Sequence, residues 1–567
     1  MLPPSFKLPI ALQESKRLVP SSVRDDLELD KTQNGDGPPT FERIVGSHST
    51  EFGKLTMPLW TQYYTDDVAF LRDTQRLFTS GLPKLESRYE AMAEVWSDIQ
   101  QETNFHERYQ FIEWEWLESL NHNPSFLQAL SMYNMGSPLL SLALPVLLMV
   151  TPLFILRSQG RSVSFTDYFS ALKRVLRNHQ IGQLFTVGSA SWDKRTYVVI
   201  SFCFYIFQVY QNFMACIRFH RNMRKIHDDI VTVRGFVEDA VTLMDAHEEV
   251  AADYTTYREF TSATAHHRRA LVELLYSLKG VSRWKLSASR LGGVGRAMCC
   301  YYRICRRDDI QEALRYAVQF VGYCDNVSSL KASIAAKRLT PCSFNDGSTQ
   351  FRGAFFPGKS HRPPVRNTYT LQKQLMITGP NASGKTTLLK TTLLNILLCQ
   401  QIGMGFFKAA RIAPYGSIHC YLNIPDTSGR DSLFQAEARR CKDILDAVEK
   451  SPPGSRHFCV FDELYSGTNP SEAVASAVAF LRYLNRYPGV SYIVTTHFTD
   501  LCRRLESDKK VRNCCMSTKE RDDGLRYTYR LVDGVSSVRG GARVLKALHY
   551  PVEILEDTKN MIAGMDE

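Results

Sequence analysis

The chain has 567 residues, a net charge of +11 and a pI of about 8.9, and 44% of its residues are hydrophobic. This length suggests roughly three to four domains of about 150 residues each, and the composition excludes a wholly disordered chain. The basic excess permits binding to nucleic acid or anionic lipid, although a solvated basic surface explains it equally well.

The 14 cysteines show no Cys-x-x-Cys spacing. Their local clusters lack the paired knuckles or partner histidines of a zinc site, which favours free thiols in a reducing compartment. The N-terminus has no basic segment followed by a long apolar core, so it does not read as a secretory signal. Residues 1–50 are rich in Pro, Gly, Asp and Ser, and this composition predicts a mobile N-terminal arm.

Residues 51–134 carry helical spacing with many aromatic residues and predict a helical region. Two uncharged apolar runs follow, at 135–156 and 196–217. Both are long enough to cross a bilayer, which takes about 20 apolar residues. The first run contains three prolines and the second contains Gln208, Gln211 and Asn212, which need polar partners. We predict that residues 135–217 form a transmembrane hairpin with a basic connection.

The connection between the two runs complicates this topology. It carries six Lys or Arg residues: Arg161, Lys173, Arg174, Arg177, Lys194 and Arg195. A two-helix hairpin would place this basic loop across the membrane from an ATPase that needs cytosolic nucleotide. One alternative is a re-entrant or interfacial hairpin, with residues 168–180 as a basic amphipathic helix on the lipid surface. The soluble alternative is two apolar helices inside a helical bundle.

Residues 218–345 are mostly charged and helical, and they predict a lever and a connector. From 346 to 567, strands alternate with helices, as in an α/β domain with a mostly parallel sheet. The predicted fold class is therefore an α/β P-loop NTPase domain at the C-terminus, preceded by an all-α region with two apolar helices.

The stretch 379–386 fits the phosphate-binding pattern G-x-x-x-x-G-K-[ST], between an apolar strand and a helix. Backbone N–H groups of such a loop surround the β-phosphate, and the helix N-terminus favours negative charge. Lys385 is expected to neutralise the β- and γ-phosphates, and Thr386 to bind Mg²⁺. The predicted nucleotide-binding residues are Gly379, Pro380, Asn381, Ala382, Ser383, Gly384, Lys385, Thr386 and Thr387.

Two further strands end in polar residues. In HFCVFDELYSGT (457–468), Asp462 is expected to join the Mg²⁺ shell and Glu463 to activate the attacking water. In SYIVTTH (491–497), His497 ends a strand at the sheet edge that faces the ligand crevice, so it can reach the γ-phosphate. These patterns predict an ATPase that uses ATP and Mg²⁺, with Lys385, Glu463 and His497 in catalysis.

These motifs resemble those of the MutS superfamily in order and spacing over roughly 350–563. TGPNASGKTT is similar to the family's TGPNxxGKST, SGRDSLFQAE to its GxSTFxxEM loop, DELYSGT to its DExGxGT, and TTHFTDL to its THxxEL. The final segment resembles the glycine-rich turn and C-terminal dimer helices of the family. The resemblance implies a homodimer in which Ser432 of one subunit caps the ATP of the other, and it implies DNA as a partner by default.

The chain also departs from the family pattern. Tyr465 and Ser466 replace the usual glycine-or-alanine and arginine. The mismatch-reading domain with its Phe-x-Glu wedge is not evident, because Phe111-Ile112-Glu113 lies in a helical, tryptophan-rich stretch. The two apolar runs resemble instead divergent, membrane-associated MutS-like proteins of some bacteria and large DNA viruses.

Three functions compete. The first is a dimeric MutS-like ATPase that moves a membrane-anchored helical lever, with the ATPase domain on the cytosolic side. The second is a soluble cytoplasmic or nuclear clamp for mismatch repair or recombination on DNA. The third is an ABC-type transporter, which is disfavoured because the chain lacks an LSGGQ-type motif and has only two apolar runs. The sequence specifies no other MutS-like or repair partner.

Overall fold

The computed structural model forms two compact units. Unit 1 comprises Met1–Ser87, Thr242–His266 and Tyr316–Glu567, and unit 2 comprises Arg88–Val241 and His267–Arg315. Three long helices contribute residues to both: α11 (Trp192–Ala251), α12 (Arg258–Leu278) and α15 (Asp308–Ala335). The structure describes residues 6–32, 37–45, 50–80, 82–83, 89–101, 104–158, 164–176, 191–285, 287, 291–358, 363–422, 432–521, 524–536, 538, 545 and 548–564.

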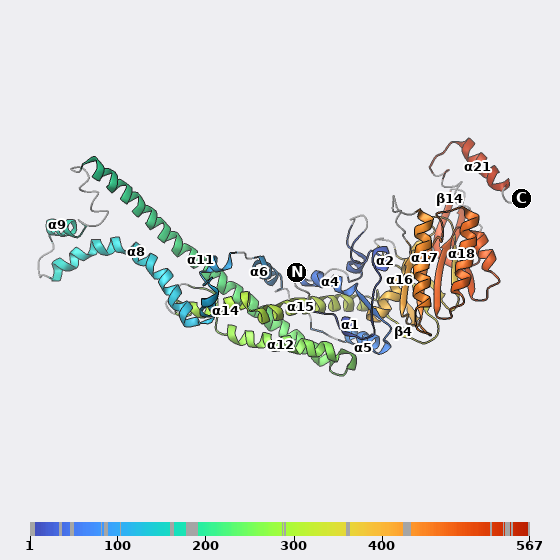
Figure 1. Ribbon diagram of the computed structural model, residues 1–567, viewed down its shortest axis with the longest axis horizontal. Coiled ribbons are helices and arrows are strands. Elements are labelled where there is room, and N and C mark those ends of the chain that lie inside the picture. Colours follow the sequence, from blue (N-terminus) through green and yellow to red (C-terminus); the bar gives the residue numbers. More distant parts are fainter. Residues whose placement is uncertain are drawn as a thin grey trace. The chain divides into compact units, whose positions relative to one another are not determined.

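A six-stranded sheet forms the centre of the C-terminal domain in unit 1 (Figure 1). Its order is β10 (Ser417–Tyr421), β11 (His457–Asp462), β12 (Val490–Thr496), β7 (Gln374–Thr378), β13 (Val511–Arg521) and β14 (Gly524–Asp533). The first five strands are parallel, and β14 pairs antiparallel with β13 at one edge. Of these six strands, β7 comes earliest in the sequence, and it lies between β12 and β13 in the sheet. The strand order therefore reverses beside β7, which is where ligands bind in open α/β sheets.

Helices flank this sheet (Figure 1). Buried residues of α17 (Leu433–Glu449), α18 (Pro470–Leu484) and α19 (Thr499–Leu505) form one apolar cluster with inward side chains of the strands. Helix α16 (Lys385–Ile402) is buried over nearly its whole length. A helix that is buried on all its faces is covered on every side, as in the core of a domain. The predicted α/β domain with a mostly parallel sheet is confirmed.

Shorter elements complete unit 1. A four-stranded sheet has the order β4 (Ser343–Phe344), β9 (Ala409–Ile412), β5 (Gln350–Ala354) and β6 (Asn367–Thr370), and β3 (Thr340–Pro341) pairs with β8 (Met404–Gly405). The 3-10 helix η3 (Thr255–Tyr257) precedes α12, and α21 (Val552–Gly564) is the last helix. The glycine-rich turn predicted before the dimer helices lies mostly outside the described residues.

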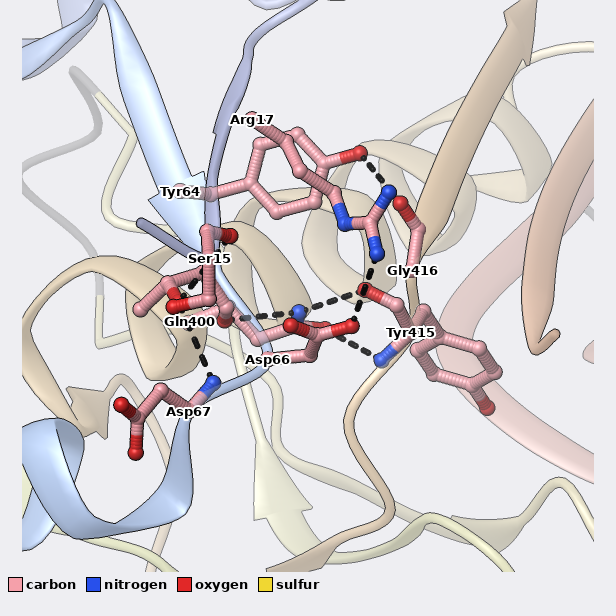
Figure 2. A network of polar contacts seen from close by, with 9 residues as sticks. Ser15, Arg17, Tyr64, Asp66, Asp67, Gln400, Tyr415 and Gly416 are labelled. Atoms are coloured by element: carbon pink, nitrogen blue, oxygen red, sulfur yellow. Dashed lines mark hydrogen bonds and ion pairs between the residues drawn. The ribbon is translucent and has the colours of Figure 1, made fainter. Parts of the chain in front are cut away.

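The predicted mobile arm is wrong for the described part of residues 1–50, which packs on the C-terminal α/β domain. This part forms α1 (Pro9–Leu12), β1 (Lys16–Leu18), α2 (Ser21–Asp26) and α3 (Thr40–Val45), followed by α4 (Glu51–Trp60), β2 (Tyr63–Thr65) and α5 (Val68–Thr79). Figure 2 shows the polar contacts. Gln400 of α16 donates its Nε2 to the carbonyls of Thr65 (3.0 Å) and Tyr415 (2.8 Å), and Tyr64 donates its hydroxyl to the carbonyl of Gly416 (3.2 Å).

The physical reason is that apolar side chains are spaced through this polar segment. Phe6 is fully buried, with its ring 5.9 Å from that of Phe260 and 5.2 Å from that of Tyr316. Arg17 of β1 forms an ion pair at 3.2 Å with Asp66, the residue that follows β2. Composition averages over such residues, whereas burial depends on where each one points.

Unit 2 has an aromatic core. Its remaining elements are α6 (Tyr89–Gln101), α7 (Phe105–Tyr109), the 3-10 helix η1 (Glu115–His122), α8 (Pro124–Ser158), α9 (Phe165–Leu176) and α14 (Val294–Arg306). Phe111 is buried, with its ring stacked on that of Phe105 at 5.1 Å and 5.0 Å from that of Tyr302. A side chain held in a core cannot insert between bases, so Phe111 does not act as a mismatch wedge.

The two apolar runs lie on α8 and α11, and their side chains face outward. Part of α11, Arg195–Ala251, is long and apolar enough to cross a membrane, and α8 would be a second such helix if its two halves, bent by 59°, form one span. The exposed apolar side chains are Leu139, Leu140, Leu144, Val146, Leu147, Met149, Val150, Leu153, Phe154 and Ile155 on α8, and Tyr197, Val199, Ile200, Phe204, Ile206, Phe207, Tyr210 and Phe213 on α11. Among the described residues, they are not the core of a helical bundle.

Candidate active site

The predicted phosphate-binding loop connects β7 to α16. Three of its residues have positive φ: Gly379 (+152°), Ala382 (+62°) and Gly384 (+98°). A side chain at Gly384 would meet the Tyr529 ring at 3.1 Å, and one at Gly379 would meet Ser383 Oγ at 2.9 Å. Glycine is needed at these two positions because the loop closes tightly and the backbone adopts a conformation that other residues rarely take. Asn381 and Ala382 are exposed at the tip of the loop.

Lys385 lies inside this loop. Its Nζ donates to the carbonyls of Gly379 (2.9 Å) and Pro380 (3.4 Å), lies 3.2 Å from His497 Nε2 and is 4.0 Å from Glu463 Oε1. Burial lowers the pKa of Lys385, opposed by the carboxylates of Glu463 and Asp462. A buried ammonium next to backbone N–H groups of a helix N-terminus is suited to bind phosphate oxygens.

The predicted Mg²⁺ ligands are brought together from α16 and β11. Thr386 Oγ1 donates to Asp462 Oδ2 at 2.7 Å, and Thr495 donates to the other oxygen of the same carboxylate. One hydroxyl and one carboxylate, beside a phosphate loop, are the hard oxygen ligands from which Mg²⁺ sites at nucleotide phosphates are built. The residues present therefore fit a Mg²⁺–nucleotide complex.

Glu463 and His497 face each other across neighbouring strands. His497 Nε2 lies 2.6 Å from Glu463 Oε1, and the Glu463 N–H donates to the carbonyl of Thr495 at 3.1 Å. The hydrogen bond from His497 lowers the pKa of Glu463, helped by the charges of His497 and Lys385. Glu463 is therefore ionised at neutral pH, as a base that accepts a proton from water has to be.

The turn after Glu463 is built on two non-glycine residues with left-handed backbone, Glu463 (φ +54°) and Tyr465 (φ +59°). This conformation is rare for side chains larger than glycine and costs on the order of 1 kcal/mol or more at each site. Tyr465 offsets the cost by burying its ring, 5.7 Å from that of Phe434 and 6.3 Å from that of Phe480.

The same turn contacts the first turns of α17. Ser466 Oγ and the Gly467 N–H donate to the two carboxylate oxygens of the buried Glu437, at 3.0 and 3.2 Å. A side chain at Gly467 would lie 2.8 Å from Leu433. Ser466, which replaces the arginine usual in the family, therefore still makes a polar contact between the turn after β11 and α17.

Ser432 is the N-cap of α17. Its Oγ accepts from the Gln435 N–H at 3.3 Å, and the Ser432 N–H donates to Gln435 Oε1 at 2.9 Å. This is a capping box, which the spacing Ser-x-x-Gln in the sequence already indicates. The turn predicted before this helix begins at residue 424, and its residues 424–431 lie outside the described residues.

Sequence reasoning missed a pocket of about 930 Å³ beside the loop. Gly384, Thr387 and Leu388 line one side of it, and Phe355, Arg366 and Tyr529 come from distant segments. Arg366 lies 4.4 Å from the centre of the Phe355 ring. An aromatic pocket next to a phosphate loop suits the base and sugar of a nucleotide. Only the fold brings these residues together, so no local pattern could reveal them.

Comparisons with known proteins identify the same domain. A family profile described as MutS domain V matches residues 375–566. A protein named Endonuclease MutS2 from Agathobacter rectalis is 32% identical over 196 residues, which is 34% of this chain and 24% of that protein. Proteins of the same name from Staphylococcus aureus and Halothermothrix orenii are 25% identical over 376 residues and 27% identical over 359 residues.

These two longer alignments cover 64% and 61% of this chain but only 45% and 42% of the relatives. The chain thus matches less than half the length of these relatives. The matched profile contains the phosphate loop, the Asp-Glu turn and His497, the groups that the fold assembles at one sheet edge. Through this ATPase domain, the chain belongs to the MutS superfamily.

Proposed function

We propose that the chain binds and hydrolyses ATP with Mg²⁺ as a homodimer, and that the nucleotide state moves its long helices. One observation carries the proposal: the carboxyl ends of β7, β11 and β12 bring Lys385, Asp462, Glu463 and His497 to one edge of the sheet. Register places Thr378, Asp462 and Thr496 at the ends of paired strands. Groups that neutralise the phosphate charge and groups that activate the attacking water can therefore act on the same phosphate chain.

The residues divide the chemistry. Lys385 and the loop N–H groups bind the β- and γ-phosphates, and Thr386 with Asp462 would hold Mg²⁺, which neutralises phosphate charge when bound. Glu463 accepts a proton from the attacking water. His497 donates to Glu463 and lies within 3.2 Å of Lys385 Nζ, so it can orient the carboxylate and reach the γ-phosphate.

Two features support a homodimer. The N-terminus of α17 offers the Ser432 hydroxyl and helix N–H groups to an anion, which by family resemblance is the ATP of the other subunit. The C-terminal segment also leaves apolar side chains exposed: Leu548, Tyr550, Val552, Ile554 and Met561. An exposed apolar face on a terminal helix suits packing against a second copy.

Replacing Ser432 with aspartate separates a capping role from a phosphate-binding role. Aspartate caps helices as well as serine does, so the stability of α17 should change little, whereas alanine should cost about 1 kcal/mol. If Ser432 faces the partner's γ-phosphate, the added carboxylate should repel it. We expect ATP binding to remain and hydrolysis to fall at least roughly tenfold, an energy of about 1.4 kcal/mol. Steady-state hydrolysis and thermal melting measure the two effects, and normal hydrolysis would leave Ser432 as a cap only.

The membrane part of the proposal rests on the outward apolar faces of α8 and α11. Burying them in lipid removes a large apolar surface from water, and the helices satisfy their own backbone groups. Helix α9, which belongs to the basic connection, contacts α8: the Tyr168 hydroxyl donates to the Met149 carbonyl at 3.0 Å. We propose a membrane-associated protein whose ATPase domain is on the cytosolic side.

Deleting residues 135–217 should release the protein from membranes. We expect the intact chain to stay with the pellet after a carbonate wash, and the shortened chain to be soluble and still bind ATP, because the phosphate loop lies far downstream. Membrane fractionation of both proteins measures their release, and a nucleotide-binding assay on both proteins measures whether the shortened chain still binds ATP. Recovery of the intact chain in the soluble fraction without detergent would refute the membrane assignment.

A clamp on DNA is the second candidate, favoured by the similarity to proteins named Endonuclease MutS2. The segment 266–285 supplies basic residues, of which Arg269, Lys279, Arg283 and Lys285 are exposed. A DNA clamp releases about 0.9 counterions for each phosphate it neutralises. A steep decrease in DNA affinity with salt, for a chain that is soluble without detergent, would favour the clamp over the membrane-anchored lever.

A further inference from the structure

A groove of about 620 Å³ lies in unit 2, between α11 and the extended segment that follows α12. Its walls include His220, Arg224, Arg283, Trp284 and Lys285. Asp228 is the acidic residue in the lining, and its carboxylate lies 3.8 Å from Arg224 Nε. Three Lys or Arg side chains against one carboxylate leave the groove cationic, so it suits an anion.

The aromatic wall of the groove is held in place by contacts of its own. Trp284 is 9% exposed, its Nε1 donates to His220 Nδ1 at 3.2 Å, and its ring lies 5.1 Å from that of His227. Arg234 Nη1 donates to the carbonyl of Val281 at 2.8 Å and ties the segment to α11. The site is therefore formed before any ligand binds.

Two cations of the groove are available to a ligand. Arg283 and Lys285 are both exposed, and within the described part of the chain neither has a hydrogen-bond or ion-pair partner. These two residues precede and follow Trp284 in the chain, so the fixed indole ring also keeps them at the groove. This arrangement offers an anionic group two charges beside a flat apolar surface.

The position of the groove on α11 indicates where the anion comes from. The uncharged run ends at Ile217, and the groove begins at His220, three residues later on the same helix. At 1.5 Å per residue this is roughly 5 Å along the axis, the depth of a headgroup layer. Arg218 and Arg221 add positive charge at the same level. Tryptophan and basic residues gather at this boundary in membrane proteins.

We propose that this groove binds the phosphate of an anionic phospholipid headgroup in the leaflet on the ATPase side. The assignment rests on the membrane association proposed above. Arg224, Arg283 and Lys285 contact the phosphate, and Trp284 packs against the glycerol or sugar. A nucleic acid is a poorer match, because the neighbouring turns of α11 expose apolar rings such as Phe207 and Phe213 that would stay in water on a DNA backbone.

The test measures lipid retained by the full-length chain after detergent purification. Labelled phosphatidylinositol phosphate and labelled phosphatidylcholine are titrated separately, each with and without inorganic phosphate. The double variant Arg283→Gln and Lys285→Gln removes both free charges. At roughly fivefold per basic residue near an anionic lipid surface, we expect the loss of both residues to weaken retention of the anionic lipid by at least roughly tenfold. Phosphatidylcholine should be retained weakly by every protein.

The matched control is Arg269→Gln with Lys279→Gln, two exposed residues of the same unit that do not line the groove. It makes the same change in charge and should retain lipid as wild type does. Three results would overturn the proposal. They are an equal loss of anionic lipid in both variants, retention of phosphatidylcholine equal to that of phosphatidylinositol phosphate, and complete displacement of the anionic lipid by inorganic phosphate. A chain that resists the carbonate wash but shows no lipid preference refutes the groove alone. If the chain is released by the wash but its retention of anionic lipid still depends on Arg283 and Lys285, the result supports the groove and refutes the membrane span.

Discussion

Replacing Lys385 with alanine should abolish ATP binding. The ammonium is buried between the carbonyls of Gly379 and Pro380 and points into the phosphate loop. Hydrogen bonds between charged partners contribute about 1.5–3 kcal/mol each, so losing the contacts to the phosphates should weaken binding by at least about 100-fold. Equilibrium binding of a fluorescent ATP analogue measures the loss.

Lys390→Ala is the control, since Lys390 lies on the same helix but is not part of the phosphate loop. It should bind ATP as the wild-type protein does. The Lys385 variant has to keep its melting temperature within a few degrees for the comparison to hold. ATP binding close to the wild-type level in a folded Lys385→Ala protein would mean that the loop is not the phosphate site.

Replacing Glu463 with glutamine should leave ATP bound and stop its hydrolysis. Glutamine preserves the size of the side chain and can still contact His497, but it cannot accept a proton from water. Loss of a general base lowers turnover by roughly 10²–10⁴. The ATP-bound form should therefore accumulate, which single-turnover kinetics with labelled ATP would detect.

Glu506→Gln, at the exposed end of α19, provides the matched control for this substitution. It removes the same charge from the same domain and should leave turnover unchanged. If the Glu463 variant turns over at a rate near that of wild type, another group activates the water. In that case the 2.6 Å contact with His497 would serve the structure of the turn.

The sequence was sufficient for the groups that lie at strand ends. The glycines, Lys385 and Thr386 occupy one short segment, and Asp462, Glu463 and His497 each follow an apolar strand, so parallel pairing alone brings them to one edge. The capping box at Ser432 is equally local and could have been predicted from Ser-x-x-Gln.

What could not be predicted depends on contacts between distant segments. Burial of Phe6 requires Phe260 and Tyr316, and one hydrogen bond of Gln400 requires Thr65, which lies 335 positions away in the chain. The pocket beside the phosphate loop is likewise formed by Phe355 and Tyr529. Polar composition in residues 1–50 concealed these contacts, because a few well-placed apolar residues decide whether a segment packs.

The departures from the family motifs are accommodated by local packing. Tyr465 adopts a left-handed backbone in a position where the family has a small residue, and its buried ring stabilises the turn. Ser466 binds Glu437, which belongs to the stretch that resembles the family's signature loop. The turn that carries Glu463 and the helix that carries Ser432 are thus joined within one subunit.

The central claim, that the ATPase site is completed by a second subunit, is tested most directly by mixing two proteins that each have impaired hydrolysis. The Ser432→Asp chain keeps its phosphate loop, and the Lys385→Ala chain keeps its Ser432. In a mixed dimer, one site has both groups intact and the other has neither. The account predicts that hydrolysis returns on mixing, below the wild-type rate because only some dimers are mixed. A mixture no more active than the two proteins measured separately would contradict it.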